Sequence, residues 1–403
     1  MLRVLHVMND FPFPPNHGGR LDVWGRLQAL GELGCEVDAL VTVKALPDAA
    51  AVGEVSRRVR SLQIIRRAPN VTGVFSRRPI QIETRRALSQ LRFSESYDVV
   101  LLEQEYTAPV LEAPSLKYGK ACLRVHNGES AYYAELARTE RNWWKKAYYY
   151  IESSRFREAS EQVFRQVDEL WFISWDDYNR WVQNWPGEMS RAEWLPAAIP
   201  GPWRPWSPAE KRVLIAGNLF QPTNLEGLEW YLNDVHPRLS IRGGYELWVA
   251  GSTRGKTART LLARLSRTPR VRTFLNPPCL ASIYEQCGVF VNPMQRGVSV
   301  KLKTLDAIAH GLPVVSTPAG TEGTGLQPGE HVLWARDGAE MADLLRSLLE
   351  SPARRQALAV AAQAFLRDRY DQKRNLSRLM GLARHTASAA PDADYSAPAT
   401  RRG

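Results

Sequence analysis

The feature that most constrains this chain is an alternation of short β-branched runs with longer helical patterns, which occurs twice along its length. In the first half, five strands are predicted at residues 3–8, 37–43, 97–102, 121–125 and 169–174. The second half repeats the pattern with strands at residues 212–217, 245–251, 271–274, 288–293, 313–317 and 331–335. Continuous apolar strands that alternate with helices predict a parallel sheet covered on both faces.

A break between the two halves predicts two domains. Residues 196–211 are rich in proline and have no hydrophobic period, which is typical of a linker. The chain has 403 residues, more than one hydrophobic core usually serves. We therefore predict an α/β protein with Rossmann-like domains at residues 1–198 and 212–371, joined by a linker at residues 199–211. Residues 386–403 are rich in Ala, Ser, Pro and Asp, and we expect them to be disordered.

Composition narrows the class of protein. The chain is 44% hydrophobic and 24% charged, as soluble globular proteins are. Its four cysteines form no CxxC motif or Cys/His cluster, which argues for a reducing compartment and against a structural zinc. No apolar run approaches the roughly 18 residues of a membrane-spanning helix, and the apolar start is too short for a signal peptide. We therefore expect a cytoplasmic protein. The net charge of +11 indicates an anionic partner: nucleic acid, a membrane surface or a phosphorylated substrate.

Two loops of the first half follow predicted strands. In "NDFPFPPNHGGR", Gly18 and Gly19 stand just before a helix, where backbone N–H groups can approach a phosphate; the alternative is a simple glycine turn. In "RVHNGES", His126, Asn127 and Glu129 follow the strand at 121–125. Ligands of open α/β sheets bind at the carboxyl ends of strands, although a lone loop histidine is often structural.

The second half offers candidates in the same places. Gly217 and Asn218 end the first strand of this half, and Asn224 is a plausible N-cap for the next helix, which is reason enough for its presence. In "VSVKLKTLDAIAHGLPVV", a helix that begins near residue 300 places Lys303 and Asp306 on its polar side. Cations in a first helical turn are disfavoured by the helix dipole, so Lys301 and Lys303 suggest a bound anion. The alternative is a solvated face on which Asp306 pairs with Lys303 and His310.

Positive charge gathers in the first half. Arginine doublets begin at residues 57, 66, 77 and 85. Downstream, "RNWWKKAYYYIESSRFR" sets aromatic rings beside cations; its prominent members are Trp143, Trp144, Lys145 and Lys146. This combination suits an anionic membrane interface. The alternative is a solvated helix whose aromatic rings pack on the domain.

Together, "PPNHGGR", "RVHNGE" and "GVSVKLKTLDAIAHGLPVVSTPAGTEG" resemble the GT-B glycosyltransferases of the large retaining family four, in the variant common among bacterial surface-polysaccharide enzymes. The resemblance covers roughly residues 1–385. It implies a GT-B fold with a deep interdomain cleft, an acceptor-binding first domain and a nucleotide-sugar-binding second domain. A C-terminal helix at residues 372–385 would return to the first domain. The implied activity is transfer of a sugar from a nucleoside-diphosphate sugar to a lipid-linked or growing polysaccharide acceptor with retention of configuration, in cell-surface polysaccharide biosynthesis.

The resemblance also implies roles for residues. Gly18 and Gly19 would face the donor diphosphate, and His126 would lie beside the donor sugar. Asp306 matches the carboxylate that binds the ribose, and Lys301 would neutralise the departing diphosphate.

The chain departs from the family pattern at two places. Val298 stands where the family often has its first carboxylate. Asn218 and Asn224 stand in the region where many members carry an arginine and a lysine. The phosphate cations must therefore come from elsewhere, and the candidates are Arg296, Lys301 and Lys303.

No cofactor or metal is expected. The only Asp-x-Asp motif, Asp392 to Asp394, lies in the tail with no strand to position it. The expected partners are a nucleotide sugar, a lipid-linked or glycan acceptor and an anionic membrane surface on the inner face of the plasma membrane. The rival functions are a GT-B-fold nucleotide-sugar epimerase or phosphorylase and a basic nucleic-acid-binding protein. No helix-turn-helix, RRM or KH signature supports the nucleic-acid-binding alternative.

Overall fold

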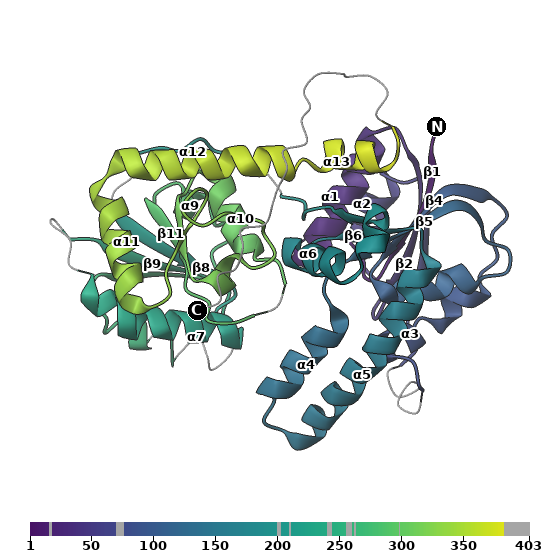
Figure 1. The fold of residues 1–403 in the computed structure, drawn as a ribbon, viewed down its shortest axis with the longest axis horizontal. Coiled ribbons are helices and arrows are strands. Elements are labelled where there is room, and N and C mark those ends of the chain that lie inside the picture. Colours follow the sequence, from purple (N-terminus) through teal and green to yellow (C-terminus); the bar gives the residue numbers. More distant parts are fainter. Residues whose placement is uncertain are drawn as a thin grey trace.

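A computed structural model describes residues 1–15, 18–69, 76–199, 203–208, 211–239, 244–254, 260–261, 263–297 and 299–382. Two parallel sheets form the centres of two α/β domains that lie side by side (Figure 1). The prediction of two Rossmann-like domains is therefore confirmed. The predicted tail and Asp392 to Asp394 lie outside the described residues, as do parts of the predicted linker.

The first domain is built on a seven-stranded parallel sheet in the order β3-β2-β1-β4-β5-β6-β7. Its strands are β1 Arg3–Met8, β2 Glu36–Val43, β3 Ser61–Arg66, β4 Ser96–Glu103, β5 Lys117–Val125, β6 Glu169–Phe172 and β7 Ala192–Trp194. The central strands are buried over their carboxyl-terminal halves, as expected for a parallel sheet with helices on both faces. Strands β3 and β7 escaped prediction because β3 alternates exposed and half-buried residues and β7 has three residues.

Helices cover both faces of this sheet. The helices of the domain are α1 Gly18–Glu32, α2 Ala49–Ser56, α3 Ile80–Glu83, α4 Glu129–Thr139, α5 Trp143–Gln166 and α6 Trp175–Asn184. Residues of α1 and α2 contribute to the core on one face, and residues near the end of α5 and in α6 pack on the other. Helices α4 and α5 pack on each other and form a hairpin that projects away from the sheet (Figure 1).

The second domain has a six-stranded parallel sheet in the order β10-β9-β8-β11-β12-β13. Its strands are β8 Arg212–Ala216, β9 Glu246–Gly251, β10 Val271–Leu275, β11 Val289–Asn292, β12 Val314–Ser316 and β13 Leu333–Trp334. Its helices are α7 Pro222–Trp230, α9 Ala281–Tyr284, α10 Leu302–Ala309, α11 Gly338–Glu350 and α12 Pro352–Arg369. Helices α7 and α11 pack on one face, and α9, α10 and α12 pack on the other.

The end of the described chain crosses between the domains. Helix α12 runs along the second domain, and α13 (Gln372–Leu379) then packs against α1 of the first (Figure 1). Leu376, Leu379 and Met380 are buried in the core of the first domain. The chain thus ties its second domain back to its first. Among the helices of the described residues, none is long and apolar enough to cross a membrane.

Candidate functional site

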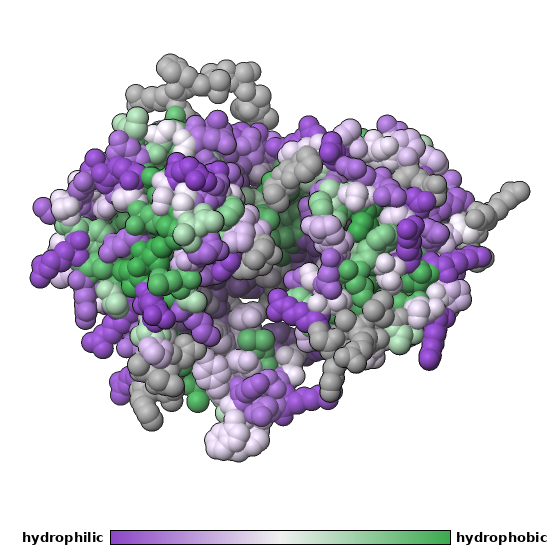
Figure 2. Space-filling model, turned by 180° about the vertical axis from the view of Figure 1, so that it is seen from behind, coloured by the Kyte–Doolittle hydropathy of each residue, from purple (hydrophilic) through white to green (hydrophobic). Residues whose placement is uncertain are grey.

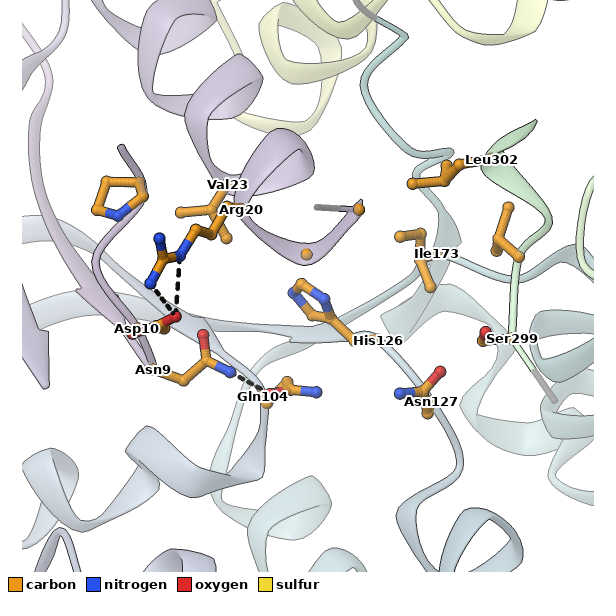
Figure 3. A pocket seen from close by; sticks show the side chains of 14 residues that line it. Asn9, Asp10, Arg20, Val23, Gln104, His126, Asn127, Ile173, Ser299 and Leu302 are labelled. Carbon is orange, nitrogen blue, oxygen red and sulfur yellow. Dashed lines mark hydrogen bonds and ion pairs between the residues drawn. The ribbon is translucent and has the colours of Figure 1, made fainter. Parts of the chain in front are cut away.

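A cavity of about 330 Å³ lies where the two domains meet (Figure 3). The first domain contributes loops at the carboxyl ends of β1, β4, β5 and β6, together with the start of α1. The second contributes the segment that leads into α10. The lining residues are Asn9, Asp10, Pro12, Gly18, Gly19, Arg20, Val23, Gln104, His126, Asn127, Ile173, Ser299, Val300 and Leu302. The cavity thus joins the glycine loop and the histidine loop predicted from sequence to the segment before α10.

The glycine loop makes the close approach between the domains. Gly18 is the first residue of α1, and a Cβ atom placed on it would lie 2.6 Å from Cδ1 of Leu302. A glycine therefore lets the N-terminus of a 15-residue helix meet the second domain without a clash. The free N–H groups of that helix end favour an anion. Gly18 and Gly19 as diphosphate-binding residues remain a prediction.

His126 forms part of the wall of the cavity and is held by a buried carboxylate. Its Nε2 lies 2.8 Å from Oε2 of Glu103, the last residue of β4. Glu103 also accepts from Arg26, and Asp22 accepts from Arg26 and Arg124. Burial alone would raise the pKa of Glu103, but Arg26 and the neighbouring histidines hold that pKa well below its usual range.

The same residues include a group that could be mistaken for a metal site. Ligand atoms of Asp22, Glu103 and His126 lie within 4.8 Å of one another, and this is the one such group among the described residues. The side chains of Arg26 and Arg124 occupy both carboxylates and balance their charge. A divalent cation would have to displace two buried guanidinium groups, so the donor set fits an ion-pair network and does not fit a metal.

The helix that carries the predicted lysines begins later than expected. Helix α10 starts at Leu302 instead of near residue 300, and Lys301 is its N-cap residue. Lys301 is buried, and its Nζ lies 3.5 Å from Oε2 of Glu322. Burial lowers the pKa of Lys301, against the opposing effect of Glu322. An incoming diphosphate would therefore compete with a carboxylate for this lysine.

Lys303 belongs to a separate polar cluster at the carboxyl end of β8. Its Nζ donates to Oδ1 of Asn224 at 2.7 Å, and Nδ2 of Asn224 donates to the carbonyl of Asn218 at 3.0 Å. A Cβ on Gly217 would lie 3.6 Å from Cδ of Lys303. Burial and the charge of Lys301 lower the pKa of Lys303 to about 7.

This cluster corrects two expectations. The N-cap residue of α7 is Gln221, so Asn224 lies inside the first turn of the helix and is not its cap. Its side chain instead accepts a hydrogen bond from Lys303 at the carboxyl end of the sheet. Lys303 consequently does not pair with Asp306, as the solvated-face alternative supposed. The cluster brings together Gly217, Asn218, Asn224 and Lys303, all of which were predicted to bind the donor. Lys303 thus supplies a cation next to Asn224, in the region where the family resemblance leads one to expect a lysine.

Neither Lys301 nor the residues of this cluster line the cavity, and three other predicted residues do not line it either. Asp306 lies 3.5 Å from His310 Nδ1, and Arg296 lies 2.9 Å from Glu226 on the surface. Glu129 is buried beneath the histidine loop, where its carboxylate accepts from Tyr106 at 2.6 Å. Burial raises the pKa of Glu129 to about 7. Their assigned roles remain predictions, and Val298 lies outside the described residues.

The hairpin of α4 and α5 carries the predicted membrane residues at its tip. Trp143 and Trp144 are 62% and 67% exposed, and their rings stack with centroids 3.5 Å apart. Lys145 is exposed and Lys146 is half-buried. Tyr148 and Tyr149 are partly buried against the core between the two helices, whereas Tyr150 is exposed. The packing alternative therefore holds for Tyr148 and Tyr149 and fails for the tryptophans.

The sequence analysis missed several cavity residues. Asn9 and Asp10 follow β1, and Gln104 follows β4, at the same sheet edge as His126. Asn9 and Gln104 form a hydrogen bond, and Arg20 pairs with Asp10 at 3.0 Å (Figure 3). Their positions just after predicted strands, at the carboxyl end of the sheet, were the signal that could have found them.

Three solved structures share this architecture. Anabaena Alr3699/HepE, solved with UDP and glucose, is 12% identical, with 95% of this chain and all of that chain covered and a TM-score of 0.63. Sucrose-phosphate synthase of Thermosynechococcus elongatus is 13% identical, with 95% and 99% covered and a TM-score of 0.66. WaaG, a glycosyltransferase involved in lipopolysaccharide biosynthesis, is 15% identical, with 93% and 99% covered and a TM-score of 0.59. These likenesses show that the fold is GT-B.

Sequence comparison identifies the family. Residues 210–351 match the family of glycosyl transferases group 1. The whole chain is similar to an uncharacterized 44.6 kDa protein in the cps region of Klebsiella pneumoniae, at 33% identity over 392 residues that cover 94% of this chain and 99% of that protein. The chain belongs to the family of this Klebsiella protein, and it is a glycosyltransferase of the group 1 type.

Proposed function

We propose that this glycosyltransferase moves a sugar from a nucleoside-diphosphate sugar to a lipid-linked or growing polysaccharide acceptor, with retention of configuration and without a metal ion. The transfer reaction would take place at the inner face of the plasma membrane. The observation that carries the proposal is the cavity between the domains, in which Gly18, Gly19 and His126 of the first domain face Leu302 of the second.

Donor binding is supported by the charges on the second-domain side. Lys301 and Lys303 lie at the start of α10, close enough that the charge of one lowers the pKa of the other. Two adjacent buried or half-buried ammonium groups destabilise each other, and a diphosphate placed between the domains would relieve that cost. HepE was solved with UDP-glucose, which supports a nucleotide sugar as the donor class.

The reaction we favour needs no nucleophile from the protein. Front-face displacement would leave the diphosphate with the negative charge, where Lys301 and the N-terminus of α1 can stabilise it. Arg296 is held by Glu226 at the surface. We therefore assign it a smaller part than Lys301 in stabilising the diphosphate.

Membrane contact is supported by the hairpin. Figure 2 shows the hairpin extending beyond the two lobes, and its tip presents Trp143 and Trp144 beside Lys145 and Arg141, all exposed. Paired indole rings flanked by cations suit the headgroup region of an anionic bilayer. Because α4 begins directly after the histidine loop, the hairpin would bring the cavity to a lipid-linked acceptor. The relative in a cps region and the likeness to WaaG support a polysaccharide or lipopolysaccharide acceptor.

Product analysis tests the proposal. The purified protein is incubated with labelled UDP-, GDP-, TDP- or ADP-sugars and a lipid extract of the producing cells, with and without EDTA. We expect label in the lipid fraction, an unchanged anomeric configuration by proton NMR and the same rate with EDTA. An epimerised donor with no labelled lipid would contradict transfer, and loss of the rate with EDTA would contradict metal independence.

A further inference from the structure

The ring of His126 is held from the protein interior by Glu103 alone. Oε2 of Glu103 lies 2.8 Å from Nε2 of His126, and Oε1 lies 2.7 Å from Nε2 of His6. Arg26 donates to both oxygens, from Nε and from its terminal nitrogen, at 2.8 Å each. Glu103 and His6 have no exposed surface. Four contacts therefore converge on one sealed carboxylate.

The charge of that carboxylate determines which ring nitrogens carry protons. Glu103 is ionised because Arg26 and the two histidines outweigh the effect of burial on its pKa. The other charged groups at this point, Asp22 and Arg124, bind each other and add no net charge. An ionised carboxylate only accepts hydrogen bonds, so His126 must donate from Nε2.

Nδ1, the second ring nitrogen of His126, is available to a ligand in the cavity. Nδ1 has no hydrogen-bond partner among the described residues, and His126 lines the cavity together with Gln104 and Asn127 (Figure 3). In a neutral imidazole with its proton on Nε2, Nδ1 carries a lone pair and accepts. A hydroxyl group can donate to it, whereas a phosphate oxygen without a hydrogen cannot.

We propose that Glu103 is a positioning residue: it fixes the proton of His126 on Nε2 and so presents Nδ1 as an acceptor to a hydroxyl of the donor sugar, which the family resemblance already places beside His126. This inference rests on the proposed function for its ligand.

The tautomer is measured directly in the full-length protein without ligand. Long-range proton–nitrogen spectra of the ¹⁵N-labelled protein at about pH 8, where an ordinary imidazole is neutral, distinguish the two nitrogens. The signal that disappears in His126→Gln identifies the ring. We expect a protonated Nε2 and an unprotonated Nδ1 in the wild type. A proton on Nδ1 would overturn the proposal, even if no variant of Glu103 folds.

Substitution of the carboxylate tests its role. In Glu103→Gln, Arg26 retains the amide oxygen and the amide nitrogen can donate to His126, so we expect the ring proton to move to Nδ1. Affinity for UDP-glucose should fall about three- to tenfold, the value of one neutral hydrogen bond, while affinity for UDP stays the same. His6→Gln is the matched control, since it removes the other histidine partner of Glu103 without touching the cavity, and it should preserve both affinities.

The outcomes separate this inference from the proposed function. Equal losses of UDP-glucose affinity in Glu103→Gln and His6→Gln, with an unchanged His126 tautomer, would reduce Glu103 to a structural residue. Failure of the wild type to bind any nucleotide sugar would overturn the proposed function and the sugar hydroxyl together. In that case an Nε2 tautomer that is lost in Glu103→Gln would still establish the positioning role.

Discussion

Replacement of Lys303 by methionine should stabilise the unliganded protein and weaken donor binding at the same time. Lys303 is half-buried, and burial together with the charge of Lys301 lowers its pKa to about 7. The folded state therefore disfavours the charged form of Lys303. That cost to the free energy of unfolding grows as the pH falls from the pKa of an exposed lysine toward 7, and a neutral side chain removes it.

The environment of Lys303 sets the size of both effects, on the free energy of unfolding and on donor affinity. The lowered pKa corresponds to between about 1 and 4 kcal/mol at neutral pH, with the lower end favoured because solvent reaches part of the side chain. Loss of a charge-assisted contact to the diphosphate should cost about 1.5–3 kcal/mol of binding free energy, or roughly 10- to 150-fold in Kd. If the donor binds only the protonated lysine, a pKa of about 7 gives a Kd that rises about 25-fold between pH 6.5 and 8.5.

Scanning fluorimetry of the unliganded protein and calorimetric titration with the donor at several pH values measure these effects. Lys373→Met is the control, because Lys373 is exposed and lies on α13, away from the cavity. We expect Lys303→Met to raise the melting temperature and to flatten the pH dependence of Kd. A less stable variant with an unchanged pH dependence would refute the reasoning.

Three further substitutions probe the cavity and the hairpin. Lys301→Ala should abolish turnover and weaken donor binding while circular dichroism shows an intact fold. Gly18→Ala should lower turnover about tenfold, because its Cβ would lie 2.6 Å from Leu302, and Leu302→Ala in the same chain should restore it. Replacement of Trp143 and Trp144 by serine should reduce binding to anionic vesicles by tenfold or more in cosedimentation, since each buried ring contributes roughly 1.5–3 kcal/mol, and leave donor affinity unchanged.

Each of these has a result that would count against it. Unchanged turnover in Lys301→Ala removes that residue from the site. A Gly18→Ala variant that Leu302→Ala does not rescue places the effect elsewhere than at the domain contact. For the hairpin, Trp185→Ser is the control, because Trp185 is 44% exposed at the end of α6 and outside the hairpin. Equal loss of vesicle binding in the Trp143/Trp144 double variant and in Trp185→Ser would contradict the assignment of the hairpin as the membrane-binding element.

The sequence predicted the sheets well because parallel strands are continuous apolar runs. The buried strands β1, β4 and β8 were located within a residue or two. The short or half-exposed edge strands β3 and β7 have no such signal. Helix ends were less certain: α10 begins at Leu302 because Lys301 has non-helical backbone angles as its N-cap, which hydrophobic periodicity cannot register.

The cavity was only partly predictable. Strand ends and glycines pointed to Gly18 and His126, since position along the sheet is readable from sequence. The partners of the charged groups were not, because they depend on contacts far apart in the chain. Lys303 reaches Asn224 across 79 positions, and Glu103 joins His6 across 97. Charge patterns along one helix therefore suggested the wrong partner for Lys303.

The central claim is that a nucleoside-diphosphate sugar binds in the cavity between the domains with Lys303 as one of its cations. Thermal-shift measurements of the wild type and Lys303→Met against UDP, GDP, TDP, ADP and their common sugars test it most directly. We predict that at least one nucleotide sugar stabilises the wild type and that the same ligand stabilises Lys303→Met much less. No stabilisation of the wild type by any of these ligands, or equal stabilisation of both proteins, would contradict the account.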